Sequence, residues 1–278
     1  MEKFKKQSDV AQMAKAALDL LNTCKNNKLN IWLDWGGLLG MIRSEGLIPW
    51  NNDLELSCKY EKNINKKMIK VVDVLSSMGY LVFYYPTIGT MNIKKNNQDI
   101  DINLNIIWKE NNFAVRPHEE VYKFSNKIKS ENYKLKLSNY SYWISRISCV
   151  YFKFHFKSFI ESKLKEKLKM IISKSINVIP IKFRKYIFLF FLNLSQKLGA
   201  NYTKTAIPFQ YFEEFIEIEF YGGMMPIPKR NIELLNYIYG KDWRIPAENW
   251  TFYKKGNENV SNMQFINDAF EYSKLDLI

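Results

Sequence analysis

The stretch IWLDWGGLLGMIRSEGLIPWNNDLEL, from Ile31 to Leu56, decides the fold. Its first three residues are apolar and predict a short buried strand. Gly36 and Gly37 follow, and a backbone without Cβ atoms can turn sharply there and approach a ligand closely. Residues 38–42 predict one or two helical turns, which the glycine and proline beyond them bring to an end. The stretch therefore predicts a strand, a glycine turn and a short helix.

An acidic pair closes this stretch. Asp53 and Glu55 alternate with Leu54 and Leu56, which predicts a strand with both carboxylates on one face and both leucines on the other. Two neighbouring carboxylates repel unless a cation lies between them, and Mg²⁺ or Mn²⁺ prefers carboxylate oxygens. The backbone N–H groups of the glycine turn could hold phosphate oxygens. Together these features predict a site for phosphoryl transfer.

The order of glycines and acids resembles the signature of the nucleotidyltransferase superfamily that includes DNA polymerase β. The resemblance rests on Gly36-Gly37 and, after fifteen further residues, on Asp53-Leu54-Glu55-Leu56. It implies a metal site on the strand that carries the two acids. It also implies that the glycines approach the phosphates of a donor through their backbone.

Within this signature, a smaller set of residues resembles the LicD family. That family includes bacterial phosphocholine transferases and the fukutin-related ribitol-phosphate transferases. The residues concerned are Leu38-Leu39-Gly40, Arg43 and Ile48-Pro49-Trp50. Asn51 and Asn52 stand where the family usually has aspartates, so the predicted site has less negative charge than the family pattern.

A third carboxylate is expected on a second alternating segment, QDIDINL at residues 98–104. Asp99, Asp101 and Asn103 share one face of the predicted strand. In the nucleotidyltransferase pattern the third acid lies between two apolar residues, as Asp101 does, and Asp99 fits that pattern less well. A half-exposed strand with polar side chains stays an alternative for this segment.

The composition fits a protein with a substantial core and an anionic partner. The chain has 278 residues, 47% of them apolar, and a formal charge of +13. Its three cysteines cannot pair evenly and show no metal-ligand spacing, which suits a reducing cytosol. We expect neither a secretory signal nor a transmembrane helix, since no apolar run is long enough.

Helices are expected at residues 9–24 and 62–78, on either side of the predicted site in the sequence. Closer to the C-terminus, residues 216–220 predict a strand before a Gly-Gly turn, and residues 231–239 predict a helix. The residues after that helix, Tyr239 to Pro246, resemble the closing motif of LicD proteins, with a Tyr-Gly pair, an acid and a proline. The resemblance therefore extends over nearly the whole chain.

Residues 151–200 differ in composition from the rest. They contain eleven Lys or Arg and two Glu, interleaved with long apolar residues. A basic amphipathic helix pair of this kind is typical of proteins that lie on an anionic membrane. A helical hairpin packed on the core with a solvated basic face is an equal alternative. Nucleic-acid binding is a third and weaker alternative, since no recognised module is present.

These observations predict an α+β protein with a nucleotidyltransferase-like, DNA polymerase β-like core. A mixed sheet flanked by helices forms this core within one domain of residues 1–278, and a basic helical insertion occupies about 151–200. The resemblance implies catalytic and metal-binding roles for Asp53, Glu55 and Asp101. It implies substrate-binding roles for four further residues, namely Gly36, Gly37, Arg43 and Asp34.

The activity implied is metal-dependent transfer of a phospho-alcohol group, such as phosphocholine or ribitol phosphate. The donor would be CDP-linked, the acceptor a hydroxyl of a glycan, glycolipid or lipid-linked glycan, and the cofactor Mg²⁺ or Mn²⁺. The resemblance implies that this reaction modifies a cell-surface polysaccharide. The enzyme would be cytoplasmic, either free or bound peripherally at the inner face of the membrane. The alternatives are a nucleotidyltransferase with another acceptor and a non-catalytic protein that binds a membrane surface.

Overall fold

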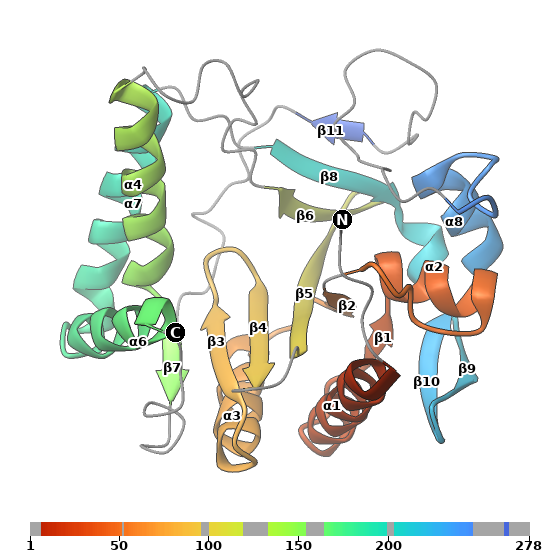
Figure 1. The fold of residues 1–278 in the computed structure, drawn as a ribbon. Helices are drawn as coiled ribbons and strands as arrows, with labels where there is room; N and C mark the ends of the chain where they lie inside the picture. The colour runs from red at the N-terminus through yellow and green to blue at the C-terminus, as the bar shows by residue number, and fades with distance from the viewer. Residues whose placement is uncertain are drawn as a thin grey trace.

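The computed structural model describes residues 7–51, 53–95, 100–118, 133–153, 164–198, 203–246 and 264–266 (Figure 1). Its α-helices are α1 Gln7–Asn26, α2 Trp35–Ser44, α3 Ile64–Ser77, α4 Tyr133–Ser148, α6 Leu164–Asn177, α7 Ile181–Lys197 and α8 Asn231–Tyr239, and a 3₁₀ helix, η1, covers Phe209–Phe212. Its strands are β1 Ile31–Leu33, β2 Leu54–Lys59, β3 Leu81–Tyr85, β4 Thr90–Lys95, β5 Ile100–Glu110, β6 Phe113–His118, β7 Tyr151–Lys153, β8 Thr203–Pro208, β9 Phe215–Phe220, β10 Gly223–Pro228 and β11 Gln264–Ile266.

Within the described residues, nine strands form one mixed sheet. Its main path runs β11-β8-β6-β5-β4-β3-β7, and β2 joins it through a parallel pairing with β5. The neighbours along the main path are antiparallel, as is β1 on β2. Strands β9 and β10 form a separate hairpin. The expected mixed sheet flanked by helices is confirmed.

Helices α1 and α3 pack on the sheet as their apolar periodicity predicts. Leu20 of α1 and Val71 of α3 are completely buried in the main core, which also contains Leu54 and Leu56 of β2. Burying each such side chain stabilises the fold by about 1.5–3 kcal/mol. The helices expected at 9–24, 62–78 and 231–239 correspond to α1, α3 and α8, so these predictions are confirmed.

A second layer of helices covers the other face of the sheet near β3 and β7. Strand β3 is buried along its whole length, with Val82 and Tyr84 in the main core and Leu81 and Phe83 in a second apolar cluster. That second cluster includes Phe188 of α7. A strand covered on both faces is expected to be a continuous apolar run rather than an alternating one, which explains the sequence LVFYY.

The structure changes two expectations. Gly36 and Gly37 belong to the first turn of α2 rather than to a turn before it, and Trp35 instead adopts the left-handed backbone, with φ of 46°. The segment expected as a helical insertion begins with β7, which pairs with β3 in the main sheet before α6 and α7 follow.

The predictions for Asn52 and Asp99 lie outside the described residues. The prediction of a single domain over residues 1–278 stays a prediction. All three cysteines are buried and free of disulfides. Among the helices described here, none is long and apolar enough to cross a membrane.

Candidate active site

Strand β2 carries the acidic pair as the alternation predicts. Leu54 and Leu56 are buried, whereas Asp53, just before the strand, and Glu55 are partly accessible. The parallel register with β5 places Glu55 beside Asn103 and Leu54 beside Ile102. The two carboxylates therefore lie at the start of β2, on the polar face that β2 shares with β5.

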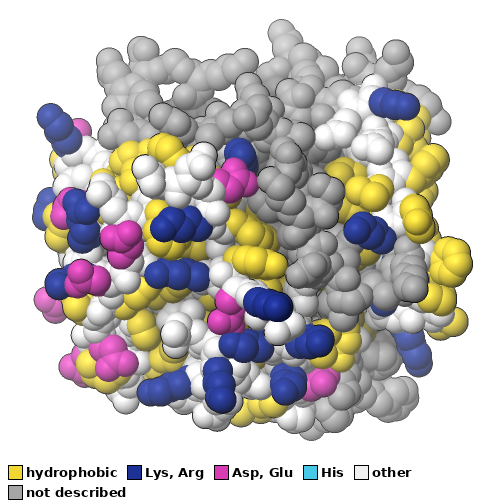
Figure 2. All heavy atoms as spheres, turned by 180° about the vertical axis from the view of Figure 1, so that it is seen from behind, with side chains coloured by type: hydrophobic (Ala, Val, Ile, Leu, Met, Phe, Trp, Pro, Cys, Tyr) yellow, Lys and Arg dark blue, Asp and Glu magenta, His cyan; other side chains and the backbone are white. Residues whose placement is uncertain are grey.

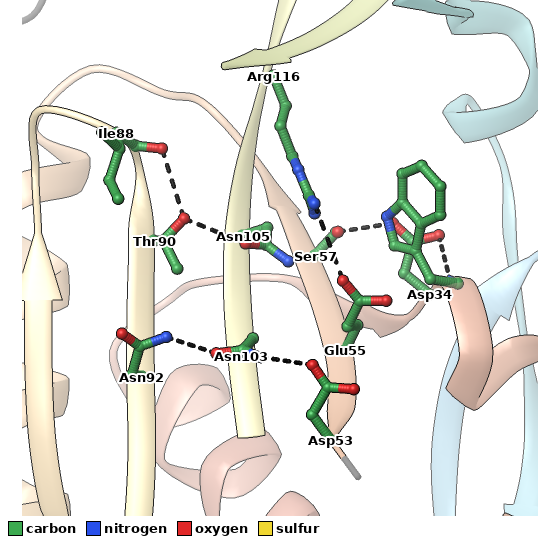
Figure 3. A network of polar contacts seen from close by, with 11 residues as sticks. Asp34, Asp53, Glu55, Ser57, Ile88, Thr90, Asn92, Asn103, Asn105 and Arg116 are labelled. Atoms are coloured by element: carbon green, nitrogen blue, oxygen red, sulfur yellow. Dashed lines mark hydrogen bonds and ion pairs between the residues drawn. The ribbon is translucent and has the colours of Figure 1, made fainter. Parts of the chain in front are cut away.

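Glu55 is held by positive charge and a backbone donor. Its Oε1 lies 3.8 Å from Nη2 of Arg116 (Figure 3). The backbone N–H of Gly36 also donates to its carboxylate. Burial is the largest influence and, together with the charges of Asp53 and Asp34, it raises the pKa of Glu55 from 4.5 to about 7 despite the opposing effect of Arg116. The ionised form of Glu55 is therefore destabilised at neutral pH, and a nearby cation would stabilise it.

Asp53 is oriented by amide side chains. Asn103 donates from Nδ2 to Oδ2 of Asp53 at 3.0 Å, and Asn92 on β4 donates to the oxygen of Asn103. Asn51 donates to the backbone oxygen of Asp53 at 2.8 Å. This row of amides crosses β4, β5 and β2 in Figure 3 and sets the direction of the carboxylate.

Asp101 lies on the same strand as Asn103 but has another partner. Its Oδ2 is 3.2 Å from Nζ of Lys94 on β4, and both side chains are about one-third exposed. Within the described part of the chain, no group of three or more His, Cys, Asp or Glu side chains is placed to hold a metal ion. Asp101 would have to leave Lys94 to join Asp53 and Glu55 at a shared cation.

Asp34 attaches helix α2 to strand β2. Its Oδ1 accepts from the backbone N–H of Trp35 at 2.9 Å, as a helix N-cap, and its Oδ2 accepts from Oγ of Ser57 at 2.6 Å. The side chain is buried, and burial raises its pKa. An aspartate directly before a helix is a recognisable capping signal, which the sequence interpretation as a substrate contact passed over.

The two glycines allow close packing in the first turn of α2. A Cβ atom on Gly36 would lie 2.6 Å from Nδ2 of Asn51, and one on Gly37 would lie 2.7 Å from methyl groups of Leu33 and Leu54. Gly37 is therefore a packing position between β1 and β2. Gly36 faces the polar site, and this agrees with the hydrogen bond from its N–H to Glu55.

Arg43 lies at the opposite end of α2 from the glycines. Its guanidinium is 6.0 Å from the centre of the Trp50 ring, and its Nε donates to Oγ of Ser44 at 3.3 Å. Burial lowers the pKa of Arg43, opposed by the phenol of Tyr239. That tyrosine is buried in α8, and its pKa is raised by burial and by the charges of Glu55, Asp34 and Asp53, so it borders the site.

Arg116 is the main site residue that the sequence interpretation missed. It projects from β6, and its guanidinium lies 5.2 Å from the centre of the Trp35 ring and next to Glu55. Its Nη1 is buried and has no hydrogen-bond partner among the described residues. A single arginine on an alternating strand carries no local signal for this role, because the role depends on how β6 and β2 approach each other.

Asp53 and Glu55 are the carboxylates of this site that could hold a divalent cation. Each is partly accessible, their negative charges oppose one another, and the raised pKa of Glu55 reports excess negative charge and poor solvation. The positive end of the α2 dipole and the guanidinium of Arg116 would attract phosphate oxygens nearby. The arrangement can bind a cation and a phosphate ester side by side.

Residues 28–133 match the family described as LicD/FKTN/FKRP, nucleotidyltransferase domain. This range contains the acidic pair, α2 and Arg116, whereas Tyr239 lies outside it. An uncharacterized protein of Rickettsia prowazekii (strain Madrid E) is 34% identical over 80 residues, which are 29% of this chain. The chain aligns with 28% of the length of that relative.

Two solved structures are more distantly similar. The solution structure of the antibiotic-resistance factor ANT(2'')-Ia is 10% identical, with 68% of this chain and 96% of that chain covered and a TM-score of 0.31. The crystal structure of ANT(2'')-Ia in complex with adenylyl-2''-tobramycin is 10% identical, with 66% and 98% covered and a TM-score of 0.28.

Proposed function

We propose a function from the premise that residues 28–133 of this chain match the LicD/FKTN/FKRP nucleotidyltransferase domain. The protein transfers a phospho-alcohol group from a CDP-linked donor to a hydroxyl group of a glycan or glycolipid, as a step in cell-surface polysaccharide modification. The observation that carries this proposal is the placement of Asp53 and Glu55 beside the N-terminus of α2, with Arg116 against Glu55.

The proposed reaction exchanges one phosphorus–oxygen bond for another. The acceptor oxygen attacks the phosphorus that bears the alcohol, the bond from that phosphorus to the oxygen of the CMP unit breaks, and CMP leaves. The acceptor hydroxyl loses its proton in the process. The carboxylates of Asp53 and Glu55 would hold Mg²⁺ or Mn²⁺. The bound ion would neutralise charge on the donor phosphates and lower the pKa of the acceptor hydroxyl.

The protein's own groups position the substrates. Arg116 is fixed between Trp35 and Glu55, so its guanidinium is held in place before charge develops on the donor phosphates. Asp34 and Ser57 keep the start of α2 against β2, so the positive end of the helix dipole stays beside the two carboxylates. Gly36, Gly37 and Arg43 complete the proposed donor contacts.

Asp101 belongs to the proposal as a third carboxylate. It lies on β5, which pairs with β2 in parallel register, and side chains at matched positions of neighbouring strands lie close together. Its partner Lys94 is partly exposed, and such a pair contributes about 0–1 kcal/mol. A cation could therefore compete with Lys94 for this carboxylate at small cost.

The test is an incubation of the full chain with a panel of CDP-alcohols, a glycan acceptor and Mg²⁺ or Mn²⁺, with CMP release as the readout. We expect CMP release that requires the divalent cation and is lost in Asp53→Asn. If the protein releases pyrophosphate from a nucleoside triphosphate and no CMP from any CDP-alcohol, it is a nucleotidyltransferase with another acceptor. Absence of both products with all acceptors would favour a non-catalytic binding protein.

A further inference from the structure

Helices α6 and α7, with the turn at 178–180 that joins them, expose an unusual amount of apolar surface. We call this segment the hairpin, although α7 packs along α4 rather than along α6. Of the sixteen exposed large apolar side chains in the described part of the chain, seven belong to this hairpin. Their exposed fractions lie between 51% and 83%. They are Leu164, Leu168 and Ile171 of α6, Val178 of the turn, and Phe183, Tyr186 and Phe190 of α7. We call this set the hairpin face.

The hairpin face follows helical spacing and is separate from the packed side of the same helices. Its members recur at intervals of three and four residues on each helix, which places them along one side. The opposite side is buried, with Met170 on α6 and Phe188 and Leu192 on α7 packed beneath it. Both helices are thus apolar on two sides, and the internal core accounts for one side alone.

The hairpin is also strongly basic. Residues 164–198 contain seven Lys and one Arg against a single acid, Glu166. In Figure 2, which shows the molecule from behind, apolar and Lys or Arg side chains lie side by side at the right-hand edge, where these helices come into view. The described cations include Lys174 and Lys197, both exposed, and Lys185. Other lysines of the basic segment at 151–200 are not described in full. Residues 157 and 163 lie outside the described residues, and for residues 153, 165 and 169 the side chains do.

A cavity of about 380 Å³ opens where the hairpin turns. It is lined by Val178, Ile179 and Pro180 of the turn, by Tyr151 of β7, and by Arg184 of α7. The guanidinium of Arg184 donates to Asn177, whereas its Nε is buried and has no hydrogen-bond partner among the described residues. Burial lowers the pKa of Arg184, which shows that this cation lacks full solvation. An anionic oxygen in the cavity would accept the hydrogen bond that Nε of Arg184 can donate.

We propose that the hairpin face docks on an anionic phospholipid bilayer, with its apolar side chains at the acyl boundary and its cations among the lipid phosphates. Apolar residues flanked by basic ones along one side of a helix are what such a surface recognises. The cavity beside Val178 would take one lipid phosphate at Arg184. The hairpin lies beyond β7 at one end of the sheet, whereas α2, β2 and β6 surround the candidate active site nearer the other end (Figure 1). Docking by this edge leaves the site uncovered.

The test is co-sedimentation of the full chain with phosphatidylserine–phosphatidylcholine vesicles and with pure phosphatidylcholine vesicles. We expect at least tenfold stronger binding to the anionic vesicles, weakened by added salt because surface charges are screened. The triple change Phe183→Ser, Tyr186→Ser and Phe190→Ser should reduce binding about tenfold. The triple change Lys174→Gln, Lys185→Gln and Lys197→Gln should reduce both the binding and its salt dependence.

A matched control is the double change Ile216→Gln and Met224→Gln, which removes exposed apolar side chains from β9 and β10 and should leave binding unchanged. Arg184→Gln should weaken binding to anionic vesicles, whereas free inorganic phosphate at equal ionic strength should not displace the wild type. Thermal melts confirm that each variant is folded. The proposal is overturned if the wild type ignores anionic vesicles, or if the Phe/Tyr variant binds them equally well. It is equally overturned if light scattering shows a wild-type dimer that this variant converts to a monomer, because the hairpin face would then join two copies of the chain.

Discussion

The guanidinium of Arg116 lies 3.8 Å from the carboxylate of Glu55, although the strands that carry these residues are not paired with each other. Strand β5 lies between them and bonds to β2 along one part and to β6 along another. The contact places the positive guanidinium beside a carboxylate that is otherwise buried and close to the negative charges of Asp53 and Asp34. It makes Arg116 and Glu55 the electrostatic centre of the candidate site.

Glu55→Gln should stabilise the protein above neutral pH. The pKa of Glu55 is higher in the folded state, about 7, than its ordinary value of 4.5, so folding favours the protonated form. The free energy of unfolding of the wild type therefore falls as the pH rises from 4.5 through 7. Glutamine removes this loss, and we expect a gain of about 1–3 kcal/mol at pH 8 without divalent cations. Urea unfolding at several pH values measures it.

Glu217→Gln is the matched control for this experiment, because Glu217 is exposed on β9. It should leave the pH dependence of the unfolding free energy unchanged. Added Mg²⁺ should stabilise the wild type at pH 8 more than it stabilises Glu55→Gln. A wild-type curve that does not fall between pH 4.5 and 7 would mean that Glu55 is better solvated than its surroundings indicate.

Arg116→Gln should move the acid limb of the pH–activity curve to higher pH. The positive charge of Arg116 lowers the pKa of Glu55, so its removal raises that pKa above 7 and more alkaline conditions are needed for ionisation. Loss of a positioned donor should also reduce kcat by roughly 10²-fold. Arg116→Lys keeps the charge and should restore the limb in part. An unshifted limb in Arg116→Gln would remove Glu55 as the titrating group.

Asp53→Asn and Asp101→Asn separate the two outer acids. Asp53 is aligned by Asn103 next to Glu55, so its loss should abolish transfer while the thermal melt stays near that of the wild type. Asp101→Asn should also abolish transfer if the carboxylate leaves Lys94 for the cation. Near-normal turnover in folded Asp101→Asn would exclude it, and loss of activity in Asp99→Asn would then identify the third acid.

Aspartate at positions 51 and 52 should affect different properties, namely the stability of the protein at position 51 and Mg²⁺ binding at position 52. The Asn51 side chain donates to the backbone oxygen of Asp53, and a carboxylate cannot replace that donor. Asn51→Asp should therefore destabilise the start of β2, by about 1 kcal/mol. Asn52→Asp adds negative charge near the site and should tighten Mg²⁺ binding in a calorimetric titration. Equal Mg²⁺ affinity in Asn52→Asp and the wild type would show that this side chain points away from the cation.

Gly36→Ala and Gly37→Ala form a matched pair in one helical turn. Alanine favours a helix by up to about 1 kcal/mol, but at Gly37 the new methyl group meets Leu33 and Leu54 in the core. Overpacking there costs about 1–3 kcal/mol, so Gly37→Ala should lower the melting temperature. At Gly36 the methyl group meets the movable amide of Asn51, so activity should fall more than stability. The reverse ranking would contradict these assigned positions.

The sequence alone was sufficient for features that repeat within a few residues. The alternation of Asp53 and Glu55 with leucines predicted the polar face of β2, and helical periodicity predicted α1, α3 and α8. These predictions succeed because the burial of one face requires a period of two or 3.6 in the chain itself. The same local view misplaced the turn at Gly36, because it did not foresee that Trp35 would adopt the left-handed backbone beside its Asp34 cap.

The tertiary structure alone decided which distant groups meet the acidic pair. Arg116 reaches Glu55, Tyr239 borders the same carboxylates from α8, and Asp101 contacts Lys94 rather than Asp53. Each of these contacts depends on strand register and on how the chain returns to the sheet. A shift of one residue in register would turn every side chain of a strand to the opposite face, and a pattern of alternation is the same in either register. The pattern therefore determined that polar faces exist, and the packing of whole elements determined which charges share one.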